Sequence, residues 1–206
     1  MLHRPSTRIV YWPFALPPTM ISSADQWLRA GLDALGVTYQ LDTWTRLDHH
    51  RPSELTRHTV DLLFVGGGNT FRLLDVVRTC GFDEPVREFW QDGGDYYGGS
   101  AGAVLACETI EIAVGHDPNE GGLQDLAALG LVTGVAILPH FTDPQVGASR
   151  LWASEHVTEV LGLPESVGLR CVGGRATVLG AGQLSRISAD ALEHVQPGES
   201  FDLPTR

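Results

Sequence analysis

The run VDLLFVGGG, residues 60–68, sets the architecture expected of this chain. An uninterrupted apolar segment that ends in three glycines is typical of a strand buried on both faces, and such strands occur in parallel sheets. The next residues, NTFRLLDVVRTCG at 69–81, have the apolar spacing of a helix and a glycine at its end. A buried strand followed by a helix is the basic unit of an α/β protein.

The same alternation continues on both sides of this run. Helical spacing is found at 20–35, 82–94, 100–110 and 148–161. Strand patterns are found at 8–16, 37–44, 95–99 and 135–141, and residues 167–180 are expected to form a hairpin that turns at Gly173 and Gly174. Residues 112–134 are rich in Gly and Asp and are expected to be irregular. We therefore predict an α/β fold with a doubly wound, mostly parallel sheet, in a single domain that spans 1–206.

Length, charge and cysteine usage exclude several classes of function. A chain of 206 residues can bury one sizeable core. Its 14 basic and 25 acidic residues give a net charge of −11, which disfavours nucleic acid and anionic membranes as partners. The three cysteines are odd in number and widely spaced, as free thiols in a reducing compartment would be. No secretory signal or membrane-spanning segment is recognisable, so we expect a cytoplasmic protein.

Residues 98–102, GGSAG, match the pattern G-x-S-x-G of a nucleophile elbow. In such an elbow a sharp strand-to-helix turn exposes a serine hydroxyl, here that of Ser100, at the edge of a sheet. The glycines allow the strained turn, and the start of the helix supplies backbone N–H groups and positive potential. The alternative is a tight glycine turn in which Ser100 only caps the helix.

A serine becomes nucleophilic when a histidine takes its proton. His140 is the first candidate because it directly follows the buried strand pattern GVAILP and would emerge at the same sheet edge as Ser100. His116, in the loop VGHDPNE, is the second candidate. The other histidines lie in polar segments or on surface helix and tail segments, where they are expected to be solvated: His3, His49, His50, His58, His156 and His194.

The glycines at 66–68 have two possible uses. Glycine amides at a strand-to-helix turn can bind phosphate, but the lysine of a phosphate-binding loop and the G-x-G-x-x-G spacing are both missing. The same amides can instead stabilise a tetrahedral oxyanion together with the N–H of Ala101. The histidines and carboxylates show no convincing ligand spacing, so neither a metal nor another cofactor is expected.

Four segments, GGGNTFRLL, GGSAGAVLACETI, LPHFTD and GLPESVGLRCVGGRAT, resemble in order the serine peptidase family that contains aspartyl dipeptidase and, more distantly, cyanophycinase. The resemblance covers residues 60–180. It implies a flavodoxin-like, three-layer fold similar to class I glutamine amidotransferases. It also implies hydrolysis of dipeptides with an N-terminal aspartate through a Ser-His-Glu triad.

Carried over position by position, the resemblance assigns the nucleophile to Ser100, the base to His140 and the orienting acid to Glu165. It assigns the oxyanion donors to Ala101 and to Gly67 or Gly68, and substrate contacts to Asn69 and Thr70. Asp117 remains a second candidate for the acid.

The segment between HFTD and GLPE is shorter here than in the aspartyl dipeptidases, and it is where a basic residue binds the substrate's acidic side chain. Arg150 or Arg72 could replace that residue, but the shortening leaves a peptidase of different or broader specificity as an alternative. A non-catalytic small-molecule binder that keeps the elbow is another. A generic α/β-hydrolase esterase fits less well, because that fold places the acid before the histidine. A small peptide is the expected partner, and a homodimer is compatible with the sequence.

Overall fold

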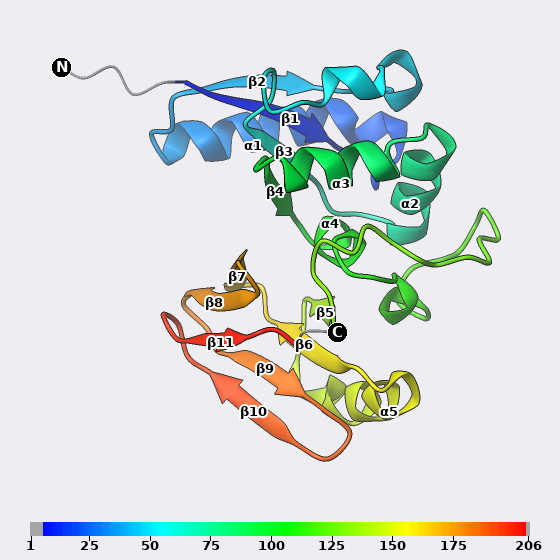
Figure 1. Ribbon diagram of the computed structural model, residues 1–206, viewed down its shortest axis with the longest axis vertical. Coiled ribbons are helices and arrows are strands. Elements are labelled where there is room, and N and C mark those ends of the chain that lie inside the picture. Colours follow the sequence, from blue (N-terminus) through cyan, green and yellow to red (C-terminus); the bar gives the residue numbers. More distant parts are fainter. Residues whose placement is uncertain (1–5, 205–206) are drawn as a thin grey trace.

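The structure of the protein is a computed structural model, which describes residues 6–204 (Figure 1). Its helices are α1 (Ile21–Ala34), α2 (Thr70–Thr79), α3 (Asp83–Gln91), α4 (Ala101–Leu105) and α5 (Val146–His156). Its strands are β1 (Thr7–Trp12), β2 (Tyr39–Thr43), β3 (Leu62–Val65), β4 (Asp95–Gly98), β5 (Val135–Pro139), β6 (Glu159–Leu163), β7 (Val167–Val172), β8 (Arg175–Gly180), β9 (Leu184–Ile187), β10 (Leu192–Val195) and β11 (Ser200–Asp202). The expected α/β class is confirmed.

The first sheet has the order β2-β1-β3-β4, and all its strands are parallel. Successive side chains of a strand face opposite sides, and both sides of this sheet are covered. Tyr11 and Phe64 pack with Leu28 of α1 on one face. Trp12 and Val65 pack on the other face, in the cluster that contains the buried residues of α2 and α3. This half of the molecule therefore has the helix-sheet-helix layers expected of buried parallel strands.

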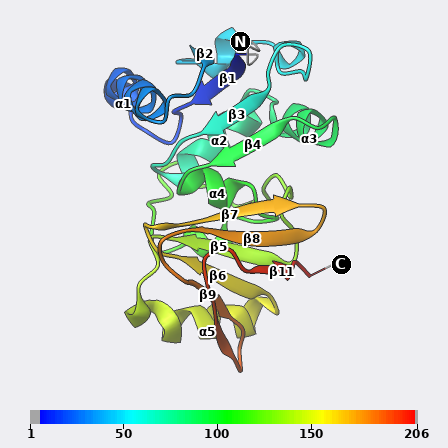
Figure 2. The ribbon, with the colours of Figure 1, turned by 90° about the vertical axis from the view of Figure 1, so that its left-hand side faces the viewer.

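The second half differs from the expectation of one mostly parallel sheet. A second sheet has the order β10-β9-β6-β5, in which only β5 and β6 are parallel. A third sheet, β11-β8-β7, is wholly antiparallel and contains the expected hairpin, with Val172 opposite Arg175. Figures 1 and 2 show the first sheet in one half and the other two sheets in the second half, with α4 between them. The predicted parallel arrangement therefore applies to the first sheet and to one strand pair beyond it.

Two predicted helices end earlier than expected. The helix expected at 148–161 is wrong at its end, because α5 stops at His156 and residues 159–163 form β6. Val157 ends α5 in a left-handed conformation, with φ of 51°. The helix expected at 100–110 corresponds to α4, which stops at Leu105. Residues 106–110 are no longer helical, and the Ile110 N–H donates to the Leu126 carbonyl.

One hydrophobic cluster joins the two halves. It runs from Val10 in β1 through Leu105 in α4 to Val160 in β6 and Ile187 in β9. Cys80, Cys107 and Cys171 are free thiols, and burial raises the pKa of Cys107 to about 12. Among the helices of residues 6–204, none has the length and apolar character to cross a membrane.

Candidate functional site

Ser100 lies on a sharp turn between β4 and α4. Its backbone has φ of 49° and ψ of −109°, a conformation that residues with a side chain seldom adopt. Ser100 occupies the N-cap position of α4, but its side chain makes no capping hydrogen bond, so the interpretation that its hydroxyl only caps the helix is wrong. The hydroxyl is therefore available to groups above the sheet edge.

The neighbouring glycines are needed for close backbone approach. A Cβ atom at Gly102 would lie 2.4 Å from the Val65 carbonyl oxygen, and one at Gly98 would lie 2.5 Å from the Gly102 carbonyl carbon. The Gly99 N–H donates to the Val65 carbonyl at 2.9 Å, which ties the turn to β3. The Tyr96 hydroxyl donates to the Gly102 carbonyl at 2.7 Å, and burial raises the pKa of Tyr96, which keeps this hydroxyl protonated. These contacts hold Ser100 in its strained position.

His140 follows the last residue of β5 and reaches Ser100 across the two halves of the molecule. Its Nε2 lies 2.7 Å from the Ser100 Oγ. Its backbone also has a positive φ, 55°, a conformation that residues with a side chain seldom adopt. The Phe141 N–H donates to the Leu163 carbonyl at 3.0 Å, and this bond joins the His140 segment to the end of β6.

Glu165 lies two residues beyond the end of β6. Its Oε1 accepts a hydrogen bond from the Nδ1 of His140. The side chains of His140 and Glu165 are 57% and 80% exposed, so the pair lies at the rim of the site and in contact with water. Ser100, His140 and Glu165 thus form a continuous chain of hydrogen bonds from three distant segments.

Asp117, the second candidate for the acid, has another role. Its Oδ2 accepts hydrogen bonds from the Thr70 N–H at 2.8 Å and from the Thr70 hydroxyl at 2.6 Å. His116 is exposed, and it is His140 that contacts Ser100. Asp117 therefore anchors the loop that follows α4 to the start of α2.

Asn69 and Thr70, the residues expected to contact substrate, are occupied by structural hydrogen bonds. Asn69 caps α2 by accepting from the Arg72 N–H at 2.8 Å, and its amide donates to the Pro118 carbonyl at 2.8 Å. Thr70 is buried beneath the loop that Asp117 anchors. Their side chains thus position the glycine turn rather than extend freely from it.

The glycine turn after β3 lies directly against the nucleophile. A Cβ atom at Gly67 would lie 2.9 Å from the Ser100 Cβ and 3.6 Å from its Oγ. Gly68 has φ of 135° and packs on the Ala15 carbonyl. Within the part of the chain that the structure describes, no backbone hydrogen bond uses the N–H of Gly67, Gly68 or Ala101. These amides are therefore free to bind a ligand oxygen.

The two arginines proposed for substrate binding lie in different surroundings. Arg72 pairs with Glu120 at 3.1 Å. Arg150 is exposed on α5, which packs against β6 and β9 in the second half. Across residues 6–204 no group of three metal-ligating side chains occurs.

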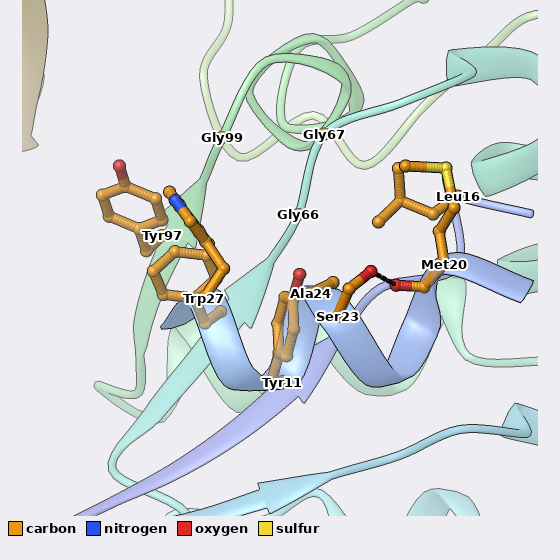
Figure 3. Close-up of a pocket in the computed structure, with 11 residues that line it drawn as sticks. Tyr11, Leu16, Met20, Ser23, Ala24, Trp27, Gly66, Gly67, Tyr97 and Gly99 are labelled. Carbon is orange, nitrogen blue, oxygen red and sulfur yellow. Dashed lines mark hydrogen bonds between the residues drawn. The ribbon is translucent and has the colours of Figure 1, made fainter. Parts of the chain in front are cut away.

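A pocket of about 420 Å³ adjoins the elbow, between α1 and the first sheet (Figure 3). It is lined by the backbone of Gly66, Gly67 and Gly99 and by the side chains of Tyr11, Leu16, Met20, Ser23, Ala24, Trp27, Phe64 and Tyr97. Sequence patterns did not identify this pocket, because aromatic residues in the strands have the same spacing as core residues. The only local signal was a tyrosine directly before the glycines of the elbow.

A serine on a strand-to-helix turn, hydrogen-bonded to a histidine that is itself bonded to a carboxylate, is the arrangement found in α/β serine hydrolases. The chain belongs to peptidase family S51, whose sequence profile matches residues 1–179. The resemblance seen in the sequence is thereby confirmed.

Several relatives support this assignment. Peptidase E of Streptomyces coelicolor is 33% identical over 168 residues, which cover 77% of this chain and 63% of that protein. A candidate alpha-aspartyl dipeptidase of Drosophila melanogaster is 33% identical over 158 residues, covering 69% of this chain and again 63% of the relative. The chain thus spans less than two thirds of the length of these relatives.

Solved structures share the fold. The match to the crystal structure of a peptidase from an acI-B1 Actinobacterium covers 97% of this chain and 84% of the Actinobacterium chain. Its TM-score is 0.71 and the sequence identity is 20%. The match to the crystal structure of a candidate peptidase E from Listeria monocytogenes EGD-e covers 92% of this chain and 86% of the Listeria chain. Its TM-score is 0.63 and the sequence identity is 20%.

Proposed function

We propose that this chain is a serine peptidase that hydrolyses short peptides through an acyl-enzyme intermediate. The observation that carries the proposal is the 2.7 Å contact between the Ser100 Oγ and the His140 Nε2. A hydroxyl within hydrogen-bond reach of an imidazole, which is in turn held by a carboxylate, is the requirement for an activated serine.

The proposed reaction has two stages. His140 Nε2 takes the proton of Ser100 as the Oγ bonds to the peptide carbonyl carbon, and Glu165 accepts a hydrogen bond from Nδ1 so that Nε2 is the basic nitrogen. The carbonyl oxygen becomes an oxyanion, bound by the N–H groups of Ala101 and Gly67. His140 then gives its proton to the leaving nitrogen as the C–N bond breaks. Water, deprotonated by His140, attacks the acyl carbon and releases the acid and Ser100.

Gly67 is favoured over Gly68 as the second oxyanion donor. The backbone of Gly67 lies against Ser100, whereas Gly68 is turned onto Ala15. Neither the Gly67 N–H nor the Gly68 N–H has a hydrogen-bond partner within residues 6–204. The preference for Gly67 therefore depends only on its proximity to the nucleophile.

Two substrate classes are supported by different observations. The name of the Drosophila relative points to dipeptides with an N-terminal aspartate. The cations offered for such a side chain are Arg150 and Arg170, which are exposed, and Arg72, which is paired with Glu120. The pocket beside Gly67 instead favours an apolar N-terminal residue.

The proposal also includes the type of fold, the number of domains and the assembly of the chain. The strand order β2-β1-β3-β4 agrees with a flavodoxin-like sheet of the kind found in class I glutamine amidotransferases. We further propose that residues 1–206 act as one domain, because one cluster of buried side chains spans both halves. Dipeptides are the proposed partners, and a homodimer is the simplest assembly if the chain self-associates.

Replacing Ser100 with alanine tests the proposed function. We expect Ser100→Ala to lower kcat by on the order of 10⁴-fold or more with an unchanged circular dichroism spectrum. A fluorophosphonate probe should label the native protein at Ser100 and fail to label the variant. Ser53→Ala, at an exposed serine of a short 3₁₀ turn, is the matched control and should keep both properties. Folded native protein that resists the probe and hydrolyses no peptide would favour the small-molecule binder instead.

A further inference from the structure

The pocket beside the elbow has the position of a substrate subsite. Gly67 and Gly99 form part of its wall, and both flank Ser100. Figure 3 shows the rings of Tyr11, Trp27 and Tyr97 around the same hollow that these glycines border. A ligand in this pocket would therefore contact the glycine turn that packs directly against Ser100.

The proposed reaction indicates which of the two substrate residues, the one before or the one after the scissile bond, this pocket would bind. The leaving nitrogen must lie near His140, because His140 gives it a proton. The lining comes from β1, α1, β3, β4 and the turns at their ends, and it includes no residue of the segments that carry His140 and Glu165. The pocket therefore fits the side chain of the residue whose carbonyl is attacked, which is the N-terminal residue of a dipeptide.

The lining determines which side chain can bind. None of the side chains that form this wall, all within residues 6–204, carries a charge. Trp27 and Tyr97 are 68% and 51% exposed, and Tyr97 stacks on Phe64 with ring centroids 4.2 Å apart. Large exposed aromatic groups around a hollow mark a binding surface more often than chance. An unpaired carboxylate would lose its hydration here without gaining a cation.

Tyr11 provides a single polar group at the base of the pocket. The residue is only 2% exposed, and its hydroxyl has no hydrogen-bond partner among the described residues. In Figure 3 the hydroxyl oxygen points toward the hollow near Gly66. The Ser23 hydroxyl, by contrast, donates to the Met20 carbonyl at 2.8 Å. Burial raises the pKa of Tyr11, so its hydroxyl remains a neutral donor.

We infer that this pocket selects peptides whose N-terminal residue is aromatic, phenylalanine or tyrosine, rather than aspartate. The inference rests on the proposed function and names its substrate class. The aromatic ring packs in the pocket that Trp27 and Tyr97 line, and the Tyr11 hydroxyl is the group available to a polar atom at the end of the ring.

A dipeptide panel tests the inference. The native protein is assayed with Phe-Leu, Tyr-Leu, Ala-Leu and Asp-Leu, with amine release as the readout. We expect kcat/KM for the two aromatic dipeptides to exceed those for Ala-Leu and Asp-Leu by about tenfold or more, the usual gain from filling an apolar pocket. A preference for Asp-Leu, or equal rates across the panel, would overturn the inference while leaving the proposed peptidase intact.

Two tryptophan variants connect any preference to the pocket. Trp27→Ala removes one wall, and we expect it to lower kcat/KM for Phe-Leu about tenfold, mainly through KM. Trp90→Ala is the matched control, because Trp90 is also exposed but lies on α3 and does not line the pocket. Equal behaviour of the two variants would contradict the pocket as the source of selectivity.

Binding to the Ser100→Ala protein separates this inference from the proposed function. Titration calorimetry with Phe-Leu and Asp-Leu should give tighter binding of Phe-Leu, even if the native protein hydrolyses neither. Tighter binding of Asp-Leu, or no binding of either dipeptide, would reject the aromatic subsite. Lack of hydrolysis with retained Phe-Leu binding would reject the peptidase alone.

Discussion

Ser100 and His140 both have strained backbones. Among residues 6–204, three residues other than glycine have a positive φ, and two of them are Ser100 and His140. Each such conformation costs about 1–3 kcal/mol and persists only where surrounding contacts impose it. The close packing of Gly98 and Gly102 imposes it on Ser100. Strain at both members of one hydrogen bond supports a functional rather than a structural role for this pair.

The identity of the orienting acid leads to a prediction at Glu165 and Asp117. We expect Glu165→Ala to lower kcat by roughly 10²–10⁴-fold without loss of stability, because it frees the His140 ring and the carboxylate is exposed. Asp117→Ala should instead lower the free energy of unfolding by about 1–3 kcal/mol, because Thr70 loses two hydrogen bonds, and should largely keep kcat. Kinetics and urea unfolding of both variants distinguish them; the reverse pattern would make Asp117 the acid.

The site residues were predictable to different degrees. The glycines around Ser100 and the strand end before His140 are local signals. Residue patterns alone therefore predicted that Ser100 and His140 lie close together. Glu165 follows a strand whose sequence, EVLGL, continues a helical pattern, and it could be assigned only by resemblance. The occupation of Asn69 and Thr70 depends on a loop 47 residues away, which no local pattern encodes.

Short strands and unusual helix ends explain the errors in the predicted elements. The strands β9, β10 and β11 have only three or four residues, too few to show alternation. The end of α5 was missed because a left-handed residue after a helix is usually glycine, and here it is Val157. The buried strands and glycine turns at 60–68 and 95–99 were predicted well, because burial on both faces leaves a continuous apolar run.

The end of α5 is a site where glycine should stabilise the protein. Val157 is 90% exposed, so it contributes little packing, and its left-handed backbone is unfavourable for a branched side chain. We expect Val157→Gly to raise the free energy of unfolding by about 0.5–1 kcal/mol. Val172→Gly, at an exposed valine of the extended strand β7, should lower it. Urea unfolding measures both changes, and destabilisation at Val157 would argue against the left-handed end.

The two halves of the molecule share one core, so they should unfold together. Trp12 is fully buried in the first half, and Trp152 packs against the same cluster from α5 in the second. We expect tryptophan fluorescence and far-ultraviolet circular dichroism to give coincident urea transitions, as a two-state domain does. The same coincidence should hold for Trp152→Phe, in which all four remaining tryptophans lie in the first half. Two separated transitions would divide the chain into independent units.

The pairing of the C-terminal strands could not be predicted from the sequence. Antiparallel partners such as β8 and β11 are joined across a long connection, and nothing in the periodicity of either strand specifies the other. The parallel half was more predictable, because each strand and its following helix are neighbours along the chain.

Because the proposed nucleophile, base and acid occur at positions 100, 140 and 165, they leave the ribosome in that order. A nascent chain that has emerged only through α4 carries the serine on its turn but has nothing to deprotonate it. The hydroxyl gains its partner only when β5 and β6 have been synthesised and have docked beneath α4. Synthesis itself would thus delay hydrolysis until the segments that carry the base and the acid have emerged and folded.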